Sequence, residues 1–144
     1  MDRPVTVLVA DDQKDTADTL AEVLNLSGFD ARAATLPLDA LRLAADCSPD
    51  VVVMDLAWPG LDGYSLARSV EKVSGRKPFL VAMTGHNGYE GRSRAEGFDG
   101  HFIKPVDPAR LVGYLRDHVR PGGGPEIAQP LQSAKSAGPA RPRD

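Results

Sequence analysis

Short strand-like segments alternate with helical segments along residues 1–119, and this alternation constrains the fold more than any other feature of the sequence. Three of the strand candidates, residues 5–10, 50–54 and 79–83, are nearly continuous apolar runs rich in β-branched residues. Such runs are typical of strands covered on both faces of a parallel sheet. Residues 30–34 and 100–103 are weaker strand candidates.

Between the strand candidates, apolar residues recur at helical spacing. The four clearest stripes are Ala17, Leu20, Ala21 and Leu24; Leu38, Leu41 and Ala45; Leu66, Val70 and Val73; and Leu111, Leu115 and Val119. A fifth segment, residues 87–96, is a poorer helix with few apolar positions. The alternation predicts an α/β fold: a doubly wound, five-stranded parallel sheet with five helices on its two faces and right-handed crossovers.

Composition divides the chain into two parts. Residues 120–144 hold nine glycines and prolines in 25 positions and only two large apolar residues, so they cannot bury enough surface to offset the entropy lost on ordering. We therefore predict one folded domain over residues 1–119 and a disordered Pro/Gly-rich tail over residues 120–144. The tail is too short to encode an output domain, so we expect the protein to act through contacts with other proteins.

Charge and hydropathy exclude several functions. Residues 1–119 contain 13 basic and 18 acidic residues, a net charge of −5 that argues against binding of nucleic acid. The apolar runs are far shorter than the roughly 18 residues of a membrane span, and the N-terminus has no signal peptide pattern. A single cysteine, Cys47, is consistent with a reducing compartment. We expect a cytoplasmic protein that does not enter a membrane.

Chemically reactive residues follow four of the predicted strands: Asp11 and Asp12, Asp55, Thr84, and Lys104. Sites in folds of this class lie at the carboxyl ends of the strands. Three carboxylates in one small crevice repel one another unless a cation shares the site, and hard oxygen ligands favour Mg²⁺. The lysine and the hydroxyl group could neutralise an incoming phosphoryl group.

Asp55 could then act as a nucleophile and form an aspartyl phosphate. A lone aspartate after a strand is more often a helix cap or a turn residue, and Asp12, Asp62 and Asp107 could each serve in that way. Capping does not readily account for the combination of complementary groups after four different strands.

Four motifs carry a resemblance to a known family. They are Val-Leu-Val-Ala-Asp-Asp (7–12), Val-Val-Val-Met-Asp-Leu-Ala-Trp-Pro-Gly-Leu-Asp-Gly (51–63), Val-Ala-Met-Thr-Gly (81–85) and Gly-Phe-Asp-Gly-His-Phe-Ile-Lys-Pro (97–105). With these motifs, residues 5–119 resemble the receiver domain of bacterial two-component response regulators, in its stand-alone form. The resemblance implies a flavodoxin-like strand order of 2-1-3-4-5.

The resemblance also implies roles for individual residues. Asp11 and Asp12 would hold Mg²⁺ together with Asp55 and the backbone carbonyl of Ala57, and Asp55 would be the phosphoacceptor. Thr84 would be the switch hydroxyl and Lys104 the phosphate-pairing lysine. The bond from Lys104 to Pro105 is usually cis in this family.

Two positions depart from the family pattern. Trp58 stands where methionine is usual, and its indole could either shield an acyl phosphate or pack on the loop; we favour packing. His101 stands where tyrosine or phenylalanine is usual, and it is the candidate switch partner of Thr84 because Phe102 should point to the opposite face of its strand. A surface histidine that couples to nothing is the alternative.

The leading hypothesis is a phosphoryl-accepting signalling module that is not an enzyme in the usual sense. Its phosphodonor would be a sensor histidine kinase or a histidine phosphotransfer protein, and its downstream target is an unknown protein. A receiver-fold adaptor that works without phosphorylation is the second hypothesis. A phosphatase with an aspartyl nucleophile is the third, and it lacks a second aspartate at position 57.

Overall fold

The computed structural model describes residues 3–85, 90–121 and 124–125. Its main sheet has five parallel strands in the order β2-β1-β3-β6-β7. The strands are β1 (Thr6–Ala10), β2 (Asp30–Ala34), β3 (Val51–Asp55), β6 (Phe79–Thr84) and β7 (Gly100–Ile103). Because β4 and β5 form a separate ribbon, this order is the expected 2-1-3-4-5, and the predicted fold class is confirmed.

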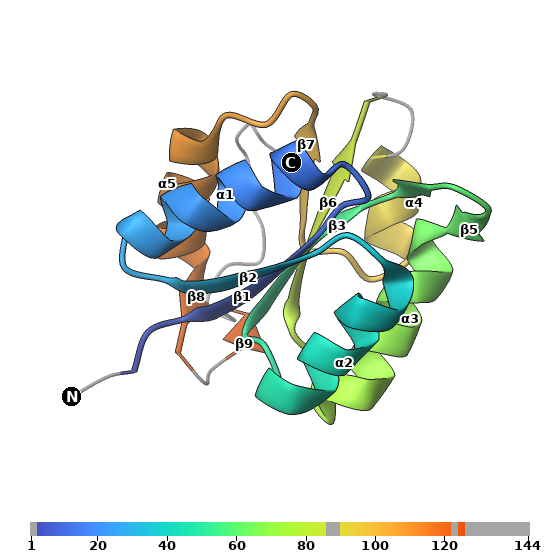
Figure 1. Ribbon diagram of the computed structural model, residues 1–144, viewed down its shortest axis with the longest axis horizontal. Coiled ribbons are helices and arrows are strands. Elements are labelled where there is room, and N and C mark those ends of the chain that lie inside the picture. Colours follow the sequence, from blue (N-terminus) through green and yellow to red (C-terminus); the bar gives the residue numbers. More distant parts are fainter. Residues whose placement is uncertain (1–2, 86–89, 122–123, 126–144) are drawn as a thin grey trace.

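Five helices follow these five strands in turn within the described residues. They are α1 (Lys14–Leu26), α2 (Pro37–Cys47), α3 (Gly63–Ser74), α4 (Glu90–Ala95) and α5 (Pro108–His118). Figure 1 shows α1 and α5 on one face of the sheet and α2 and α3 on the other. The helices therefore cover both faces of the sheet, as in a doubly wound fold. The amino and carboxyl ends of the strands form two further edges of the sheet, which these helices do not cover.

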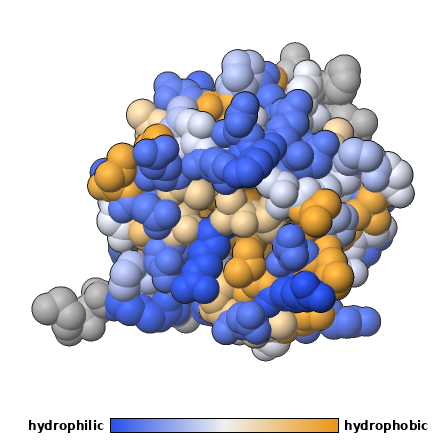
Figure 2. All heavy atoms as spheres, in the orientation of Figure 1, coloured by the Kyte–Doolittle hydropathy of each residue, from blue (hydrophilic) through white to orange (hydrophobic). Residues whose placement is uncertain are grey.

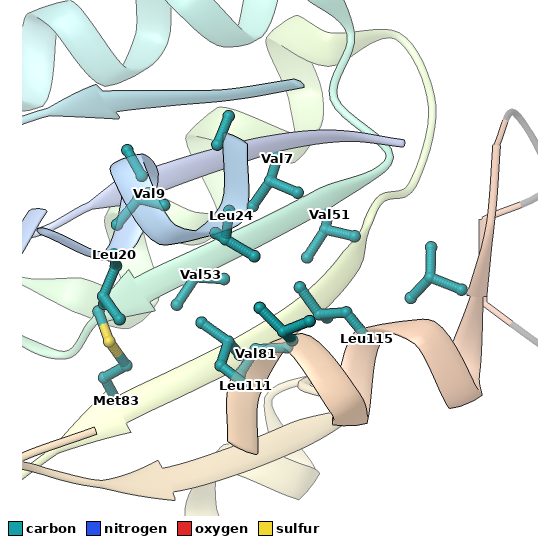
Figure 3. Close-up of a cluster of buried hydrophobic side chains, with 14 of the residues drawn as sticks. Val7, Val9, Leu20, Leu24, Val51, Val53, Val81, Met83, Leu111 and Leu115 are labelled. Atoms are coloured by element: carbon teal, nitrogen blue, oxygen red, sulfur yellow. The ribbon is translucent and has the colours of Figure 1, made fainter. Parts of the chain in front are cut away.

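The sheet separates two hydrophobic clusters, as the nearly continuous apolar strands require. One cluster joins the sheet to α1 and α5, and Figure 3 shows Leu20 and Leu24 of α1 and Leu111 and Leu115 of α5 meeting the valines of the central strands. The other cluster joins the opposite face to α2 and α3 and includes Trp58 and Tyr64. Both faces of the central strands are thus buried.

Two short ribbons lie outside the main sheet. β4 (Ala57–Trp58) pairs with β5 (Leu61–Asp62) directly after β3, and β8 (Val119–Arg120) pairs with β9 (Gly124–Pro125) after α5. Val119, predicted as the last member of a helical stripe, has extended backbone, yet its side chain is buried in the cluster with α1 and α5. The second ribbon uses the first positions of the predicted tail, whose residues 126–144 lie outside the described residues.

A buried carboxylate, that of Asp50, lies at the amino ends of β1 and β3. Asp50 is fully buried and accepts hydrogen bonds from Arg3 at 3.0 Å, from Arg76 at 2.7 Å and from the Thr6 N–H at 2.9 Å. A buried charge needs such partners, because an unpaired one is strongly destabilising. This edge is therefore occupied by structural ion pairs, and the opposite edge carries the candidate site.

The surface in Figure 2 is of mixed polarity, with hydrophilic residues interspersed among hydrophobic ones. Among the large apolar side chains that are exposed are Leu26 at the end of α1 and Leu36 and Leu38 at the beginning of α2. Of the helices that the structure describes, none has the length and apolar character needed to cross a membrane.

Candidate functional site

The predicted site residues follow neighbouring strands at one edge of the sheet. Asp11 follows β1, which pairs with β3 up to Ala10 and Met54. Asp55 ends β3 beside Met83 of β6, and Thr84 ends β6 beside Ile103 of β7, so Lys104 comes one residue later. Parallel register thus carries groups that lie up to 93 residues apart in the sequence to the same edge.

Three carboxylates and one ammonium group form the centre of this edge. One carboxylate oxygen of each of Asp11, Asp12 and Asp55 lies within 4.8 Å of the others. Lys104 Nζ donates to Asp11 Oδ2 at 3.0 Å and to Asp55 Oδ2 at 3.2 Å. These are charge-assisted hydrogen bonds, and they draw the lysine between two of the carboxylates.

Burial controls the protonation of these groups. Asp11 and Asp55 are buried, and Asp12 is more exposed. The pKa of the Asp55 carboxyl group is raised, mainly by burial and further by the nearby charge of Asp11. The Ala57 N–H and Lys104 favour the carboxylate and offset part of this rise. Burial lowers the pKa of Lys104, but the hydrogen bonds and charges of Asp11 and Asp55 outweigh burial and raise it. Lys104 is therefore a cation at neutral pH.

The backbone after Asp55 is held in a tight loop. The Ala57 N–H donates to Asp55 Oδ1 at 3.0 Å, and Trp58 Nε1 donates to the Asp55 carbonyl oxygen at 2.6 Å. The indole itself is buried in the cluster with α2 and α3, as expected for packing. It also supplies a partner for the Asp55 carbonyl, and a buried carbonyl left without one would cost about 1–3 kcal/mol.

Thr84 and His101 share one face of the sheet. Thr84 is buried, and its backbone carbonyl accepts from the Lys104 N–H at 2.8 Å. His101 lies beside Ala82, two residues before Thr84 in β6, so alternation places both side chains on the same side. Phe102 packs into the opposite cluster, against α5, which confirms the expected alternation. The peptide bond between Lys104 and Pro105 is cis.

The three aspartates that could have been helix caps separate into two groups. Asp62 accepts from the Tyr64 N–H and caps α3, and Asp107 accepts from the Ala109 N–H and caps α5. Helix α1 instead begins after Gln13, which makes no side-chain cap. Asp12 therefore belongs to the carboxylate cluster, not to the helix cap.

Sequence reasoning did not single out Gln13. Its backbone N–H donates to Asp11 Oδ1 at 2.9 Å, and its side-chain oxygen accepts from Lys104 Nζ at 3.3 Å. Its place directly after the acidic pair was the only available signal, because Gln13 is exposed and belongs to no periodic stripe. In this structure it adds a third oxygen to the surroundings of Lys104.

The arrangement suits a small, hard cation. Carboxylate oxygens from Asp11, Asp12 and Asp55 are the donors that Mg²⁺ prefers, and Mg²⁺ usually keeps waters and substrate oxygens beside one or two protein carboxylates. Ala57, predicted to offer a carbonyl, is exposed in the loop that follows Asp55. The edge can therefore hold a divalent cation next to the buried carboxylate of Asp55 and the ammonium group of Lys104.

Fold and site together define a doubly wound α/β protein with a cluster of three carboxylates beyond β1 and β3, where the strand order reverses. The chain belongs to the response regulator receiver family, since residues 7–116 match the family described as "Response regulator receiver domain". This family is a signalling domain and not a classical enzyme, and response regulators interact with histidine kinases and downstream targets.

Individual relatives agree with this membership. The transcriptional regulatory protein PrrA of Mycobacterium bovis (strain ATCC BAA-935 / AF2122/97) is 33% identical over 128 residues, which are 85% of this chain and 54% of that protein. Protein PilG of Pseudomonas aeruginosa is 31% identical over 116 residues, 78% of this chain and 86% of that protein. This chain thus spans about half the length of the PrrA relatives and most of the length of PilG.

Solved structures show the same fold. A CheY-like receiver domain from Methylobacillus flagellatus superposes with a TM-score of 0.70 at 28% identity and covers 79% of this chain and 98% of its own. A putative response regulator from Chloroflexus aurantiacus has a TM-score of 0.69 at 27% identity and covers 79% and 96%. The predicted family is confirmed.

Proposed function

We propose that this chain is a phosphoryl-accepting response regulator in which Asp55 is phosphorylated in the presence of Mg²⁺. The observation that carries the proposal is the position of Lys104, whose ammonium group contacts both Asp11 and Asp55 within a cluster of three carboxylates. A structural salt bridge would need only one carboxylate. Here Lys104 contacts two buried carboxylates that lie beside a third, and this arrangement suits a site that binds a cation and a phosphoryl group.

Each residue has a distinct task in this proposal. Asp11, Asp12, Asp55 and the Ala57 carbonyl would hold Mg²⁺, which supplies charge neutralisation to the phosphoryl oxygens. Lys104 would move from Asp55 to a phosphoryl oxygen and remain close to Asp11. The Thr84 hydroxyl would donate to another phosphoryl oxygen.

The transfer itself is a substitution at phosphorus. A carboxylate oxygen of Asp55 attacks the phosphorus of a partner's phosphohistidine, a P–O bond forms and the P–N bond breaks. The electron pair of the broken bond goes to the imidazole nitrogen, which takes up a proton. Later attack by water on phosphorus returns Asp55 to its carboxylate form and releases inorganic phosphate.

The phosphorylated state would be read out by another protein. A phosphoryl group adds about −1.5 to −2 charges, which would draw Thr84 toward it and allow His101, on the same face, to follow. The phosphodonor would be a sensor histidine kinase or a histidine phosphotransfer protein. We assign this activity to a receiver domain over residues 1–119 and place it in the cytoplasm, consistent with the free thiol of Cys47.

The test is incubation of the full chain with Mg²⁺ and acetyl phosphate, followed by intact mass. We expect a gain of one phosphoryl group that requires Mg²⁺ and is lost in Asp55→Asn. Asp39→Asn, which removes a carboxylate from the surface of α2, is the matched control and should still gain the group.

A folded wild-type chain that gains no mass with acetyl phosphate, phosphoramidate or a phosphorylated histidine kinase would contradict the proposal. That result would favour an adaptor that binds its partner without phosphorylation. A gain that persists in Asp55→Asn would instead place the phosphoacceptor elsewhere.

A further inference from the structure

The indole of Trp58 has a contact that packing alone does not require. Trp58 is 6% exposed, within the cluster that joins the sheet to α2 and α3, and its Nε1–H donates to the carbonyl oxygen of Asp55 at 2.6 Å. The side chain therefore reaches from the hydrophobic cluster to the main chain of the proposed phosphoacceptor.

This hydrogen bond completes the restraint of one peptide unit. The Asp55 carbonyl and the Leu56 N–H belong to the same planar peptide. The Leu56 N–H donates to the Met83 carbonyl of β6 at 3.0 Å, while the Asp55 carbonyl accepts from Trp58. Held at both ends, the peptide plane after Asp55 cannot rotate without the loss of a hydrogen bond.

The next peptide depends on the first. Its N–H, from Ala57, donates to Asp55 Oδ1 at 3.0 Å, and its carbonyl, from Leu56, accepts from the Gly63 N–H at 3.3 Å. A rotation of the peptide after Asp55 would turn both groups. It would also move the backbone that carries the Ala57 carbonyl, so the orientation of the Asp55 carboxylate and of a proposed Mg²⁺ ligand both depend on the indole.

We propose that Trp58 is a positioning residue, whose indole N–H orients the Asp55 carboxylate and the Ala57 carbonyl for Mg²⁺ binding and phosphoryl transfer. The proposal rests on the function proposed above and adds a residue to it. Trp58 does not touch the phosphoryl group in this scheme, and its effect passes through the main chain of Asp55.

The first test replaces the N–H while keeping an aromatic ring in the cluster. In the full chain, Trp58→Phe should lower the rate of phosphoryl gain from acetyl phosphate about tenfold, since small misplacements of reacting groups have effects of this order or larger. Its Mg²⁺ affinity, measured by calorimetry, should fall about threefold. The matched control is Val70→Ala, which opens the same cluster on α3 without touching Asp55.

A second variant separates the hydrogen bond from the shape of the side chain. Because Trp58 is the single tryptophan, it can be replaced by 3-benzothienylalanine, in which sulfur takes the place of the N–H. This variant should keep the urea midpoint close to that of the wild type and still show the slower phosphoryl transfer. Amide hydrogen exchange of Ala57 should become faster in both Trp58 variants and stay unchanged in Val70→Ala.

The outcomes distinguish the two proposals. Wild-type chain that is never phosphorylated would overturn both. The positioning role alone would be overturned by a different result. The wild-type chain would be phosphorylated, and the Trp58 variants would react and bind Mg²⁺ no worse than Val70→Ala of equal stability. A rate loss confined to Trp58→Phe and absent from the benzothienyl variant would also overturn it, because shape and not the N–H would then be responsible.

Discussion

The backbone of Gly63 packs so closely against Leu56 that a Cβ atom on Gly63 would lie 2.6 Å from the Leu56 Cα atom. This contact brings the first residue of α3 against the loop that follows Asp55. The Gly63 N–H donates to the Leu56 carbonyl at 3.3 Å, and Asp62 beside it caps the helix. A helix end, a turn and the proposed phosphoacceptor are thus joined through main-chain contacts.

Gly63→Ala should destabilise the protein, because the new methyl group meets backbone atoms that cannot turn away. We expect a loss of about 1–3 kcal/mol in the free energy of unfolding, measured with urea. Gly113→Ala is the control: it lies within α5 with open space around its Cα, and alanine should stabilise the helix by up to about 1 kcal/mol. Equal effects of the two substitutions would contradict the close contact.

Asp50→Asn should be among the most destabilising polar substitutions in this chain. It removes the fully buried carboxylate that pairs with the partly exposed guanidinium groups of Arg3 and Arg76, and the loss of hydrogen bonds to a charged group costs about 1.5–3 kcal/mol. Asp39→Asn, at an exposed pair with Arg42, should change stability little. Urea unfolding of the two variants checks the difference, and a loss for Asp50→Asn no larger than for Asp39→Asn would show that the ion pairs of Asp50 do not stabilise the fold.

Asp55→Asn should stabilise the metal-free protein near neutral pH. The raised pKa of Asp55, caused mainly by burial, means that the folded state binds a proton more tightly than the unfolded state does. Stability is therefore lost as pH rises from the unfolded pKa through the folded one, and the neutral asparagine avoids that loss.

Thermal unfolding in EDTA provides the measurement for Asp55→Asn. The variant should have the higher midpoint at pH 7, with the difference shrinking toward pH 4 and reversing on addition of Mg²⁺ to the wild type. A wild type more stable than the variant in EDTA at pH 7 would contradict this assignment.

Cys47 should react slowly with thiol reagents in the native protein. Burial raises the pKa of its thiol, and Sγ donates to the Leu43 carbonyl at 2.9 Å. In the native protein, the rate of reaction with dithionitrobenzoate should keep rising at pH values above those at which an ordinary thiol is already ionised. In guanidinium, the unfolded chain should react at pH 8 as fast as an exposed thiol does. A native rate at pH 8 equal to that of the unfolded chain would refute this.

Beryllofluoride with Mg²⁺ should change the environment of His101, because His101 and Thr84 share a face of the sheet. In NMR spectra, the ring signals of His101 should shift on addition. The ring of His118, which stacks on Tyr114 at the end of α5, should remain in place as an internal control. Unmoved His101 signals in a protein whose Thr84 amide shifts would show that this histidine does not take part in switching.

Much of the fold could be predicted from periodicity alone. The buried runs at β1, β3 and β6 and the helical stripes identified the sheet, and Pro37 and Pro108 mark the beginnings of two helices. Boundaries were less certain at α5, where Val119 keeps its buried position in extended backbone. Periodicity indicates which residues are buried. A buried residue such as Val119 fits the pattern whether it ends the helix or begins the strand that follows, so the boundary between them could not be predicted.

The candidate site was predictable for a related reason. In a parallel sheet the strand ends meet at one edge, so residues that follow the strands must come together, and Asp11, Asp55 and Lys104 do. The hydrogen bonds beyond the strands were not predictable. Gln13, for example, belongs to no stripe, and its contact with Lys104 depends on where α1 begins.

By itself, the sequence determined the α/β class, the order of strands and helices along the chain, and the set of reactive groups at one edge, because these follow from periodicity and from the geometry of parallel strands. Tertiary structure alone decided which aspartates cap helices and which join the cluster, that Asp50 is buried between two arginines, and that Trp58 donates to the main chain of Asp55. These features depend on the direction of single side chains in loops, where no repeating pattern constrains them and only packing in three dimensions selects one arrangement.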